Sequence, residues 1–156
     1  MKRLESQFCS ELKKSADILG YWFHKISDSP RSGNYLRFSV PKRFDLYLAI
    51  NKNKWIAIEA KSQGNFRAFP FNRVREDQIR YLQDFSQFGD SFIVINYRVK
   101  SKLSAFAIDI DTLLDIRDKK LKEGKKSLTY EEVSSNIKIP RIKKDGTLIW
   151  DLGVLK

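Results

Sequence analysis

Apolar residues recur along the chain at two spacings, one typical of helices and the other typical of strands. A spacing of three or four positions, as between Leu4 and Phe8, marks the buried face of a helix. Helices are predicted in this way for residues 3–19, 75–88, 111–123 and 129–136. Gly20 and Gly89 follow the first two and are typical helix ends, and Asp111 is expected to cap the third.

Short apolar runs between turn-forming residues predict the strands. These runs lie at residues 21–26, 91–98, 104–110 and 147–152, with a two-stranded hairpin over 43–62. The run at 91–98 is apolar almost throughout, which indicates burial on both faces. The turn-rich segments 27–43 and 62–77 are expected to be loops. This order of elements favours an α/β fold with a mixed sheet flanked by helices, in a single domain over residues 1–156.

The net charge of the chain indicates a nucleic-acid partner. Thirty Lys and Arg stand against nineteen Asp and Glu, a net charge of +11, and this excess is typical of proteins that bind polyanions. A membrane surface fits less well, because the sequence has no long basic amphipathic helix with an aromatic face. No apolar run approaches the roughly 18 residues of a membrane span. With a single cysteine, Cys9, and no signal core, we expect a cytoplasmic protein without disulfides.

Three charged residues lie inside the predicted hairpin, where an ordinary buried strand would have none. Asp45 lies in the first strand, and Glu59 and Lys61 lie in the second. Residues two apart on a strand share a face, so Glu59 and Lys61 point the same way. A three-residue loop, 51–53, pairs Ile50 with Lys54 and places Asp45 opposite Glu59. We take this register, because Asn tolerates the left-handed conformation that such a loop needs.

Two carboxylates on facing strand positions lie roughly 5 Å apart at their Cβ atoms. Without a cation, such closeness would raise the pKa of one of them and cost stability. Mg²⁺ removes the conflict, and it can also polarise a phosphate and activate water. Lys61 could orient that water or neutralise phosphate charge. The alternative is a solvated sheet face on which Asp45, Glu59 and Lys61 form an ordinary ion pair.

These residues resemble the core motif of the PD-(D/E)xK nuclease superfamily, with Asp45 first and then Glu59, Ala60 and Lys61. Residues 58–95 also resemble the signature of RecU-type Holliday junction resolvases. The chain is most similar to small RecU-like proteins of bacteria and phages, the penicillin-binding-protein-related factor A type. Their first helix begins Leu-Glu-x-x-Phe, as residues 4–8 do here.

The resemblance implies a restriction-endonuclease-like core and a homodimeric endonuclease of DNA recombination and repair. Such an enzyme uses Mg²⁺, with Mn²⁺ as a substitute, to resolve branched double-stranded DNA by paired nicking. Carried over, Asp45 and Glu59 are metal ligands, the Ala60 carbonyl is a third and Glu5 a further one. Lys61 is the catalytic lysine and Gln78 supports the site.

The chain also departs from the family pattern. Asp77 stands where the family has His before Gln78, which puts a base or phosphate contact by that His in doubt. Glu11 is a second candidate for the helix glutamate, and otherwise a solvated charge. No long insertion in the sequence corresponds to the stalk with which the family enters a four-way junction.

Arginines and lysines beside the acidic pair are candidates for holding the DNA backbone, because Arg binds phosphate through its planar fork. They are Arg31, Arg37, Lys42, Arg43, Arg67, Arg73 and Arg75. The basic segment 117–126 is expected to be a solvated helix end, with DNA contact as the alternative. Two other functions stay open: the same chemistry on flaps, duplex ends or a specific site, and a DNA-binding protein without catalysis.

Overall fold

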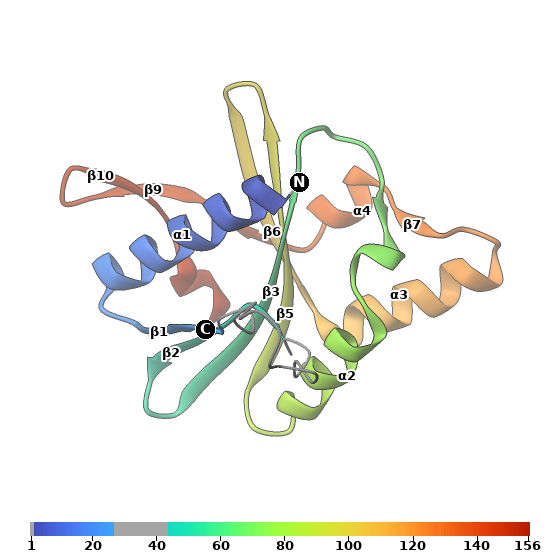
Figure 1. Ribbon diagram of the computed structural model, residues 1–156, viewed down its shortest axis with the longest axis horizontal. Coiled ribbons are helices and arrows are strands. Elements are labelled where there is room, and N and C mark those ends of the chain that lie inside the picture. The colour runs from blue at the N-terminus through green and yellow to red at the C-terminus, as the bar shows by residue number, and fades with distance from the viewer. Residues whose placement is uncertain (1, 27–43) are drawn as a thin grey trace, which may run out of the picture.

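The computed structural model describes residues 2–26 and 44–156 of the chain. A central sheet is seen nearly edge-on in Figure 1, with α1 on one side and α2, α3 and α4 on the other. The helices are α1 (Lys2–Leu19), α2 (Glu76–Phe85), α3 (Ile110–Lys122) and α4 (Tyr130–Ser134). All four correspond to helices expected from the sequence, and their bounds differ by only a few residues.

The central sheet has six strands in the order β1-β2-β3-β5-β6-β8. Their bounds are β1 Trp22–Lys25, β2 Leu46–Asn51, β3 Lys54–Gln63, β5 Asp90–Val99, β6 Lys102–Asp109 and β8 Ile137–Ile139. Strands β3 and β5 are parallel, and every other pair in this sheet is antiparallel. The expected mixed sheet flanked by helices is therefore confirmed.

Several short elements were not expected from the sequence. They are β4 (Phe69–Pro70), the 3₁₀ turn η1 (Phe71–Arg73), β7 (Ser127–Leu128), β8, β9 (Arg141–Lys144) and the C-terminal η2 (Leu152–Leu155). Strand β4 pairs with β7, and β9 pairs with β10 (Thr147–Trp150), a strand that was expected. Each of the unexpected strands has at most four residues, so a period-2 pattern has too few repeats to be recognised.

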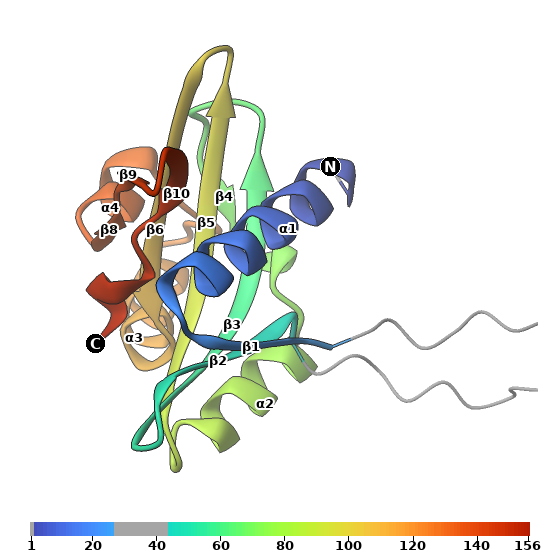
Figure 2. The same ribbon diagram turned by 90° about the vertical axis from the view of Figure 1, so that its left-hand side faces the viewer.

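Each face of the central sheet has its own hydrophobic core. Alternate residues of β3, such as Ile56 and Ile58, join Phe8 and Leu12 of α1 in one cluster. Ala57 of β3 joins Ile79 of α2 and the side chains that α3 and α4 contribute in the other cluster. Strand β5 contributes to both cores, as its continuous apolar run predicted. Figure 2 shows α1 lying across its face of the sheet.

The β2–β3 hairpin has the expected register but not the expected loop. Leu46 pairs with Ile58 and Ala49 with Trp55. This is the register that, if continued by one residue beyond β2, would place Asp45 opposite Glu59. Asn51, rather than Ile50, pairs with Lys54, and the register shifts at a bulge between Ala49 and Asn51. The three-residue loop was therefore wrong. A two-residue turn plus one bulged residue preserves the facing positions, because a bulge inserts one extra residue.

Two of the expected local signals can be checked at helix ends. At the start of α4, Thr129 and Glu132 form a capping box, as the predicted helix start near residue 129 requires. The cap of α3 is Asp109 rather than Asp111, since the Asp109 carboxylate accepts from the backbone N–H groups of Asp111 and Thr112. The helix begins one residue earlier than expected, at Ile110, which moves the capping position back.

Gly89 is a position where the fold has no room for a side chain. A Cβ atom there would lie 2.3 Å from the Trp55 carbonyl oxygen and 2.9 Å from a Phe85 ring carbon. We expect Gly89→Ala to lower the free energy of unfolding by about 1–3 kcal/mol, because the backbone of β3 must shift. Urea denaturation measures this change. Gly64→Ala is the control, since its Cβ would meet only Leu4 at an ordinary 3.9 Å; equal loss in both variants would contradict the packing argument.

Candidate active site

Asp45 and Glu59 are brought together at the end of the β2–β3 ladder. The Asp45 backbone N–H donates to the Ile58 carbonyl at 3.1 Å, and Ile58 is also the ladder partner of Leu46, the first residue of β2. The Asp45 side chain accepts from the Ala60 N–H, with Oδ2 2.8 Å from the nitrogen. Glu59 is only 2% exposed. The strands therefore fix one carboxylate beside the backbone of β3 and bury the other in β3 itself.

Lys61 provides a cation beside the buried carboxylate. Its Nζ lies 2.7 Å from Glu59 Oε1, and Lys61 itself is 8% exposed. The two residues are two positions apart on β3, so their side chains share a face. A buried carboxylate costs several kcal/mol unless it is paired, and Lys61 offsets part of that cost. The interpretation as a solvated ion pair is not supported, because neither side chain is solvent-exposed.

Gln78 of α2 binds the Glu59 carboxylate as well. Its Oε1 accepts from the Arg75 N–H at 3.1 Å, and its Nε2 donates to Glu59 Oε1 at 2.7 Å. The backbone N–H at the start of α2 requires an oxygen acceptor, so the amide group must turn its NH₂ toward Glu59. The first turn of α2 thereby sets the orientation of a side chain on β3.

Arg75 places an exposed guanidinium at the rim of this site. Asp77 binds it twice, with Nε–Oδ1 at 2.9 Å and Nη2–Oδ2 at 3.2 Å. The hydrogen bond with Asp77 raises the pKa of Arg75, and the negative charges of Glu59 and Asp45 add to the effect against the opposing effect of burial. The same hydrogen bond lowers the pKa of Asp77. Asp77, at the position where the family pattern has His, is thus paired with Arg75 at the rim of the site.

Glu5, the expected further metal ligand, is held by Arg73. Arg73 Nη2 lies 2.6 Å from Glu5 Oε1 and 3.1 Å from the Ser62 carbonyl oxygen, and Nη1 donates to Gln63 at 3.3 Å. Arg73 also lies over the Phe69 ring, and its side chain is 13% exposed. Arg73 thus joins the first turn of α1 to the end of β3. Sequence reasoning missed this role, because its partners are remote along the chain.

Glu11 is not a solvated charge, contrary to expectation. Its Oε2 accepts from Arg98 at 2.5 Å and from the Trp150 indole N–H at 3.0 Å. These contacts join α1 to β5 and β10 and span 87 and 139 residues of sequence. No local pattern could have revealed them. They give Glu11 a structural role in the packing of α1.

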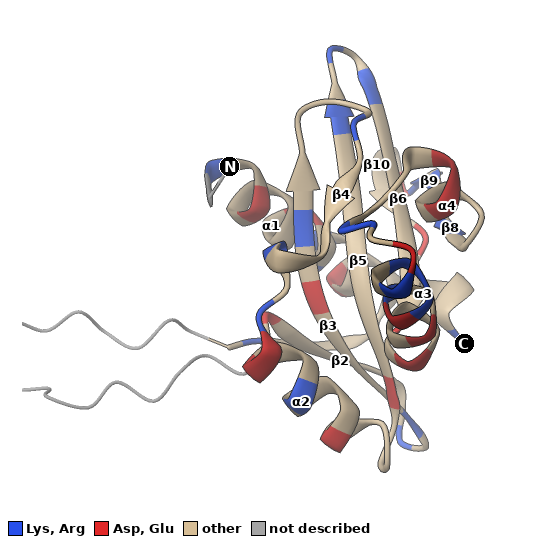
Figure 3. Ribbon diagram, turned by 90° about the vertical axis from the view of Figure 1, so that its right-hand side faces the viewer, with Lys and Arg blue, Asp and Glu red and all other residues tan. Residues whose placement is uncertain are grey.

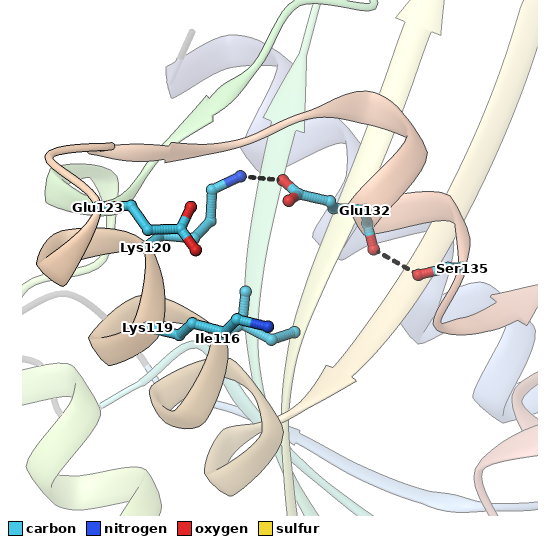
Figure 4. A pocket seen from close by; sticks show the side chains of 6 residues that line it. All are labelled: Ile116, Lys119, Lys120, Glu123, Glu132 and Ser135. Atoms are coloured by element: carbon cyan, nitrogen blue, oxygen red, sulfur yellow. Dashed lines mark hydrogen bonds and ion pairs between the residues drawn. The ribbon is translucent and has the colours of Figure 1, made fainter.

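The remaining basic candidates fall into three groups. Arg31, Arg37, Lys42 and Arg43 lie outside the described residues. Arg67 is exposed in the segment before β4. Lys120 of the basic segment 117–126 is buried and paired with Glu132, so this segment is not simply a solvated helix end. Figure 4 shows the pair at a cavity of about 280 Å³ between α3 and α4.

The donor set around Asp45 suits a hard cation such as Mg²⁺, which binds through one or two carboxylates and keeps several waters. The Ala60 N–H points toward Asp45, and the carbonyl of a strand residue lies on the same edge as its N–H. Asp45, Glu59 and the Ala60 carbonyl therefore offer oxygens at one edge of β3. Within residues 2–26 and 44–156, no group of three acidic, His or Cys side chains could hold a metal. The site fits an ion held by two carboxylates, one carbonyl and water.

Figure 3 shows the face of the sheet on which this site lies, with α2 and α3 in front of β3 and β5. The site therefore belongs to an α/β protein with a mixed central sheet, in which an acid and a lysine are buried two positions apart on β3 and an aspartate directly precedes β2. Residues 19–150 match the family RecU, described as Recombination protein U. The chain belongs to the RecU family.

One curated relative is the Holliday junction resolvase RecU of Staphylococcus saprophyticus, 30% identical over 104 residues. The match covers 66% of this chain and 49% of the relative, so the chain spans about half the length of that protein. Among solved structures, Archaeoglobus fulgidus Hjc, a Holliday junction resolvase, is 15% identical with a TM-score of 0.49. That match covers 86% of this chain and 91% of Hjc. In the part of the chain that the structure describes, no helix is long and apolar enough to cross a membrane.

Proposed function

We propose that this protein is a metal-dependent endonuclease that resolves Holliday junctions by paired nicking, with Mg²⁺ or Mn²⁺ as cofactor. The observation that carries the proposal is the Asp45 carboxylate on the Ala60 N–H, next to Glu59 in the chain, with Lys61 and Gln78 both on the Glu59 carboxylate. Buried charges of this kind stabilise a fold poorly, so a catalytic purpose explains them better than a structural one. Membership of the RecU family supports branched DNA as the substrate.

In this mechanism Asp45, Glu59 and the Ala60 carbonyl would hold the cation. A cation bound there would supply polarisation of a phosphate oxygen and a lower pKa of an attacking water. Lys61 orients that water or neutralises charge on the phosphate, from a position fixed by its contact with Glu59. Gln78 keeps the Glu59 carboxylate in place. Arg75, exposed at the rim, and Arg67 bind the flanking DNA backbone through charge-assisted hydrogen bonds.

Two further parts of the proposal concern Glu5 and the assembly. Glu5 would join the ion or its waters only after leaving Arg73, because the ion pair at 2.6 Å now occupies its carboxylate. We propose a homodimer, since two sites related by a twofold axis can cut two strands of a junction in a paired manner.

The test compares cleavage of a synthetic four-way junction with cleavage of linear duplex and flap DNA, each with Mg²⁺, with Mn²⁺ and without metal. We expect cutting that depends on the metal and is fastest on the junction. Equal cutting of all three substrates would favour a nuclease of the same chemistry with another target. Binding without cutting under every condition would indicate a DNA-binding protein without catalysis and would contradict the proposal.

Gln78→Ala is expected to slow cutting by about 10- to 100-fold, because loss of a residue that orients a metal ligand typically costs that much. The variant leaves the Glu59 carboxylate without its amide donor but keeps its charge. Single-turnover cleavage at several metal concentrations measures the effect, and extra metal should partly restore the rate. Gln83→Ala, an exposed position on the same helix, is the control. An unchanged rate in Gln78→Ala would exclude the positioning role.

A further inference from the structure

Residues of α1 and of the β9–β10 hairpin line a groove. Figures 1 and 2 show that these elements lie on the side of the sheet opposite to α2 and α3. The groove has a volume of about 170 Å³. Its lining comes from Glu11, Lys14, Ser15, Arg141, Leu148, Ile149 and Trp150. The catalytic pair lies on the other face of the sheet. The β3 residues directly before and after Glu59 pack in the core with α1, and neighbouring residues of a strand point to opposite faces.

Three cations lie along this groove. Lys14 projects from α1 and Arg141 from the start of β9, and both line the groove. Lys143 lies two residues after Arg141 and so shares its face of the hairpin. Its cross-strand neighbour is Leu148, which also lines the groove. Within the described residues, none of these three cations forms an ion pair with a carboxylate.

The one acidic residue that lines the groove is already neutralised. Glu11 Oε2 accepts from Arg98 at 2.5 Å and from the Trp150 indole at 3.0 Å. The neighbouring segment 137–150 contains four Lys and Arg residues and a single acid, Asp145 at the hairpin turn. The groove therefore has a net positive charge that calls for an anionic partner.

The β9–β10 hairpin is held against α1 by hydrogen bonds and ring contacts. The Trp150 N–H donates to Ser15 Oγ at 2.9 Å, and the Trp150 ring meets Phe8 edge-on at 5.7 Å. Arg141 lies over the Trp150 ring at 4.8 Å and donates to the Leu148 carbonyl at 3.2 Å. A cationic surface held rigidly loses little conformational entropy when it binds an anion.

We infer that the groove between α1 and the hairpin binds the phosphate backbone of a duplex arm, away from the arm at the catalytic site. The inference rests on the proposed function, which supplies a substrate with several arms. Duplex DNA presents a regular row of phosphates. Lys14, Arg141 and Lys143, which form no ion pair among residues 2–26 and 44–156, lie along a rigid edge that such a row can follow. Contacts of this kind carry no base sequence information and depend strongly on salt.

The test is the salt dependence of binding to a labelled four-way junction without divalent metal, so that no strand is cut. Lys14→Gln/Lys143→Gln removes two exposed cations and leaves Arg141 on its tryptophan. We expect the slope of log affinity against log salt to fall by about 2, one unit for each lysine. Affinity at low salt should fall about tenfold. Thermal unfolding shows whether this double variant and the wild-type protein are equally folded.

Two comparisons make the outcome decisive. Lys14→Arg/Lys143→Arg keeps both charges and should bind as wild type does. Lys119→Gln/Lys122→Gln makes the same change in net charge on α3 and should change the slope less. A slope unchanged in the groove variant, or changed equally in the α3 variant, would overturn the inference while wild type still cuts junctions. Failure of wild type to bind DNA at all would overturn the proposed function as well.

Discussion

Asp45→Asn is expected to reduce junction cutting by more than about a hundredfold. Loss of a residue that only supports a metal ligand typically costs up to about a hundredfold, and Asp45 is proposed to bind the ion itself. The change removes one negative charge and keeps an oxygen that can accept from the Ala60 N–H, a bond of 2.8 Å in the wild-type protein. The hairpin should therefore keep its register while the cation loses a ligand. Single-turnover cleavage with Mg²⁺ measures the loss.

Measurements of DNA binding and of folding show whether the loss of cutting in Asp45→Asn comes from the chemistry or from a damaged protein. Asp45→Asn should bind the four-way junction at least as tightly as wild type, since a negative charge is removed beside the DNA. Asp90→Asn is the matched control, because Asp90 lies at the start of β5 and pairs with Lys54 at the surface. Full activity in Asp45→Asn, or equal loss in Asp90→Asn, would contradict a specific role for Asp45.

Lys61→Met is expected to abolish cutting and also to lower the free energy of unfolding by about 3–5 kcal/mol, the usual cost of removing one partner of a buried pair. Lys61 is 8% exposed and Glu59 2%, so water cannot replace the lost cation. Met has nearly the length of Lys and fills the same space. Urea denaturation without metal measures the stability, and the junction assay measures the cutting.

A second substitution tests whether the cost comes from the charge. Glu59→Gln/Lys61→Met replaces the pair by neutral groups, and we expect most of the lost stability to return, since buried pairs can be replaced at little net cost. Cutting should stay absent. If the double variant were less stable than Lys61→Met, the packing of these side chains, and not their charges, would explain the loss.

The register of the β2–β3 hairpin could be predicted because one face of the hairpin is buried. A shift by one residue would turn Leu46, Leu48 and Ile56 out of the core, so the apolar alternation allows few registers. The turn was predicted incorrectly, as a three-residue loop, although the parity was right. A bulge near Ile50 has the same effect on parity, and nothing in the local sequence distinguishes the two.

Contacts between distant segments could not be predicted in the same way. Arg73 was expected to bind DNA, yet its side chain is occupied by Glu5 and the backbone of β3. Glu11 was expected to be solvated, yet it joins Arg98 and Trp150. Each outcome depends on which charges the sheet and α1 bring together, and residue spacing carries no information about that. Gln78 was expected from the family resemblance, whereas its capping contact with Arg75 is seen only in three dimensions.

The central claim is that Asp45 and Glu59 hold one divalent cation at the edge of β3. The most direct measurement is an anomalous difference map from crystals of the protein grown with Mn²⁺ and a branched DNA. We expect a single peak within roughly 2.2 Å of both carboxylates and of the Ala60 carbonyl oxygen. A peak elsewhere, or carboxylates of residues 45 and 59 that point to opposite faces of the sheet, would contradict the account.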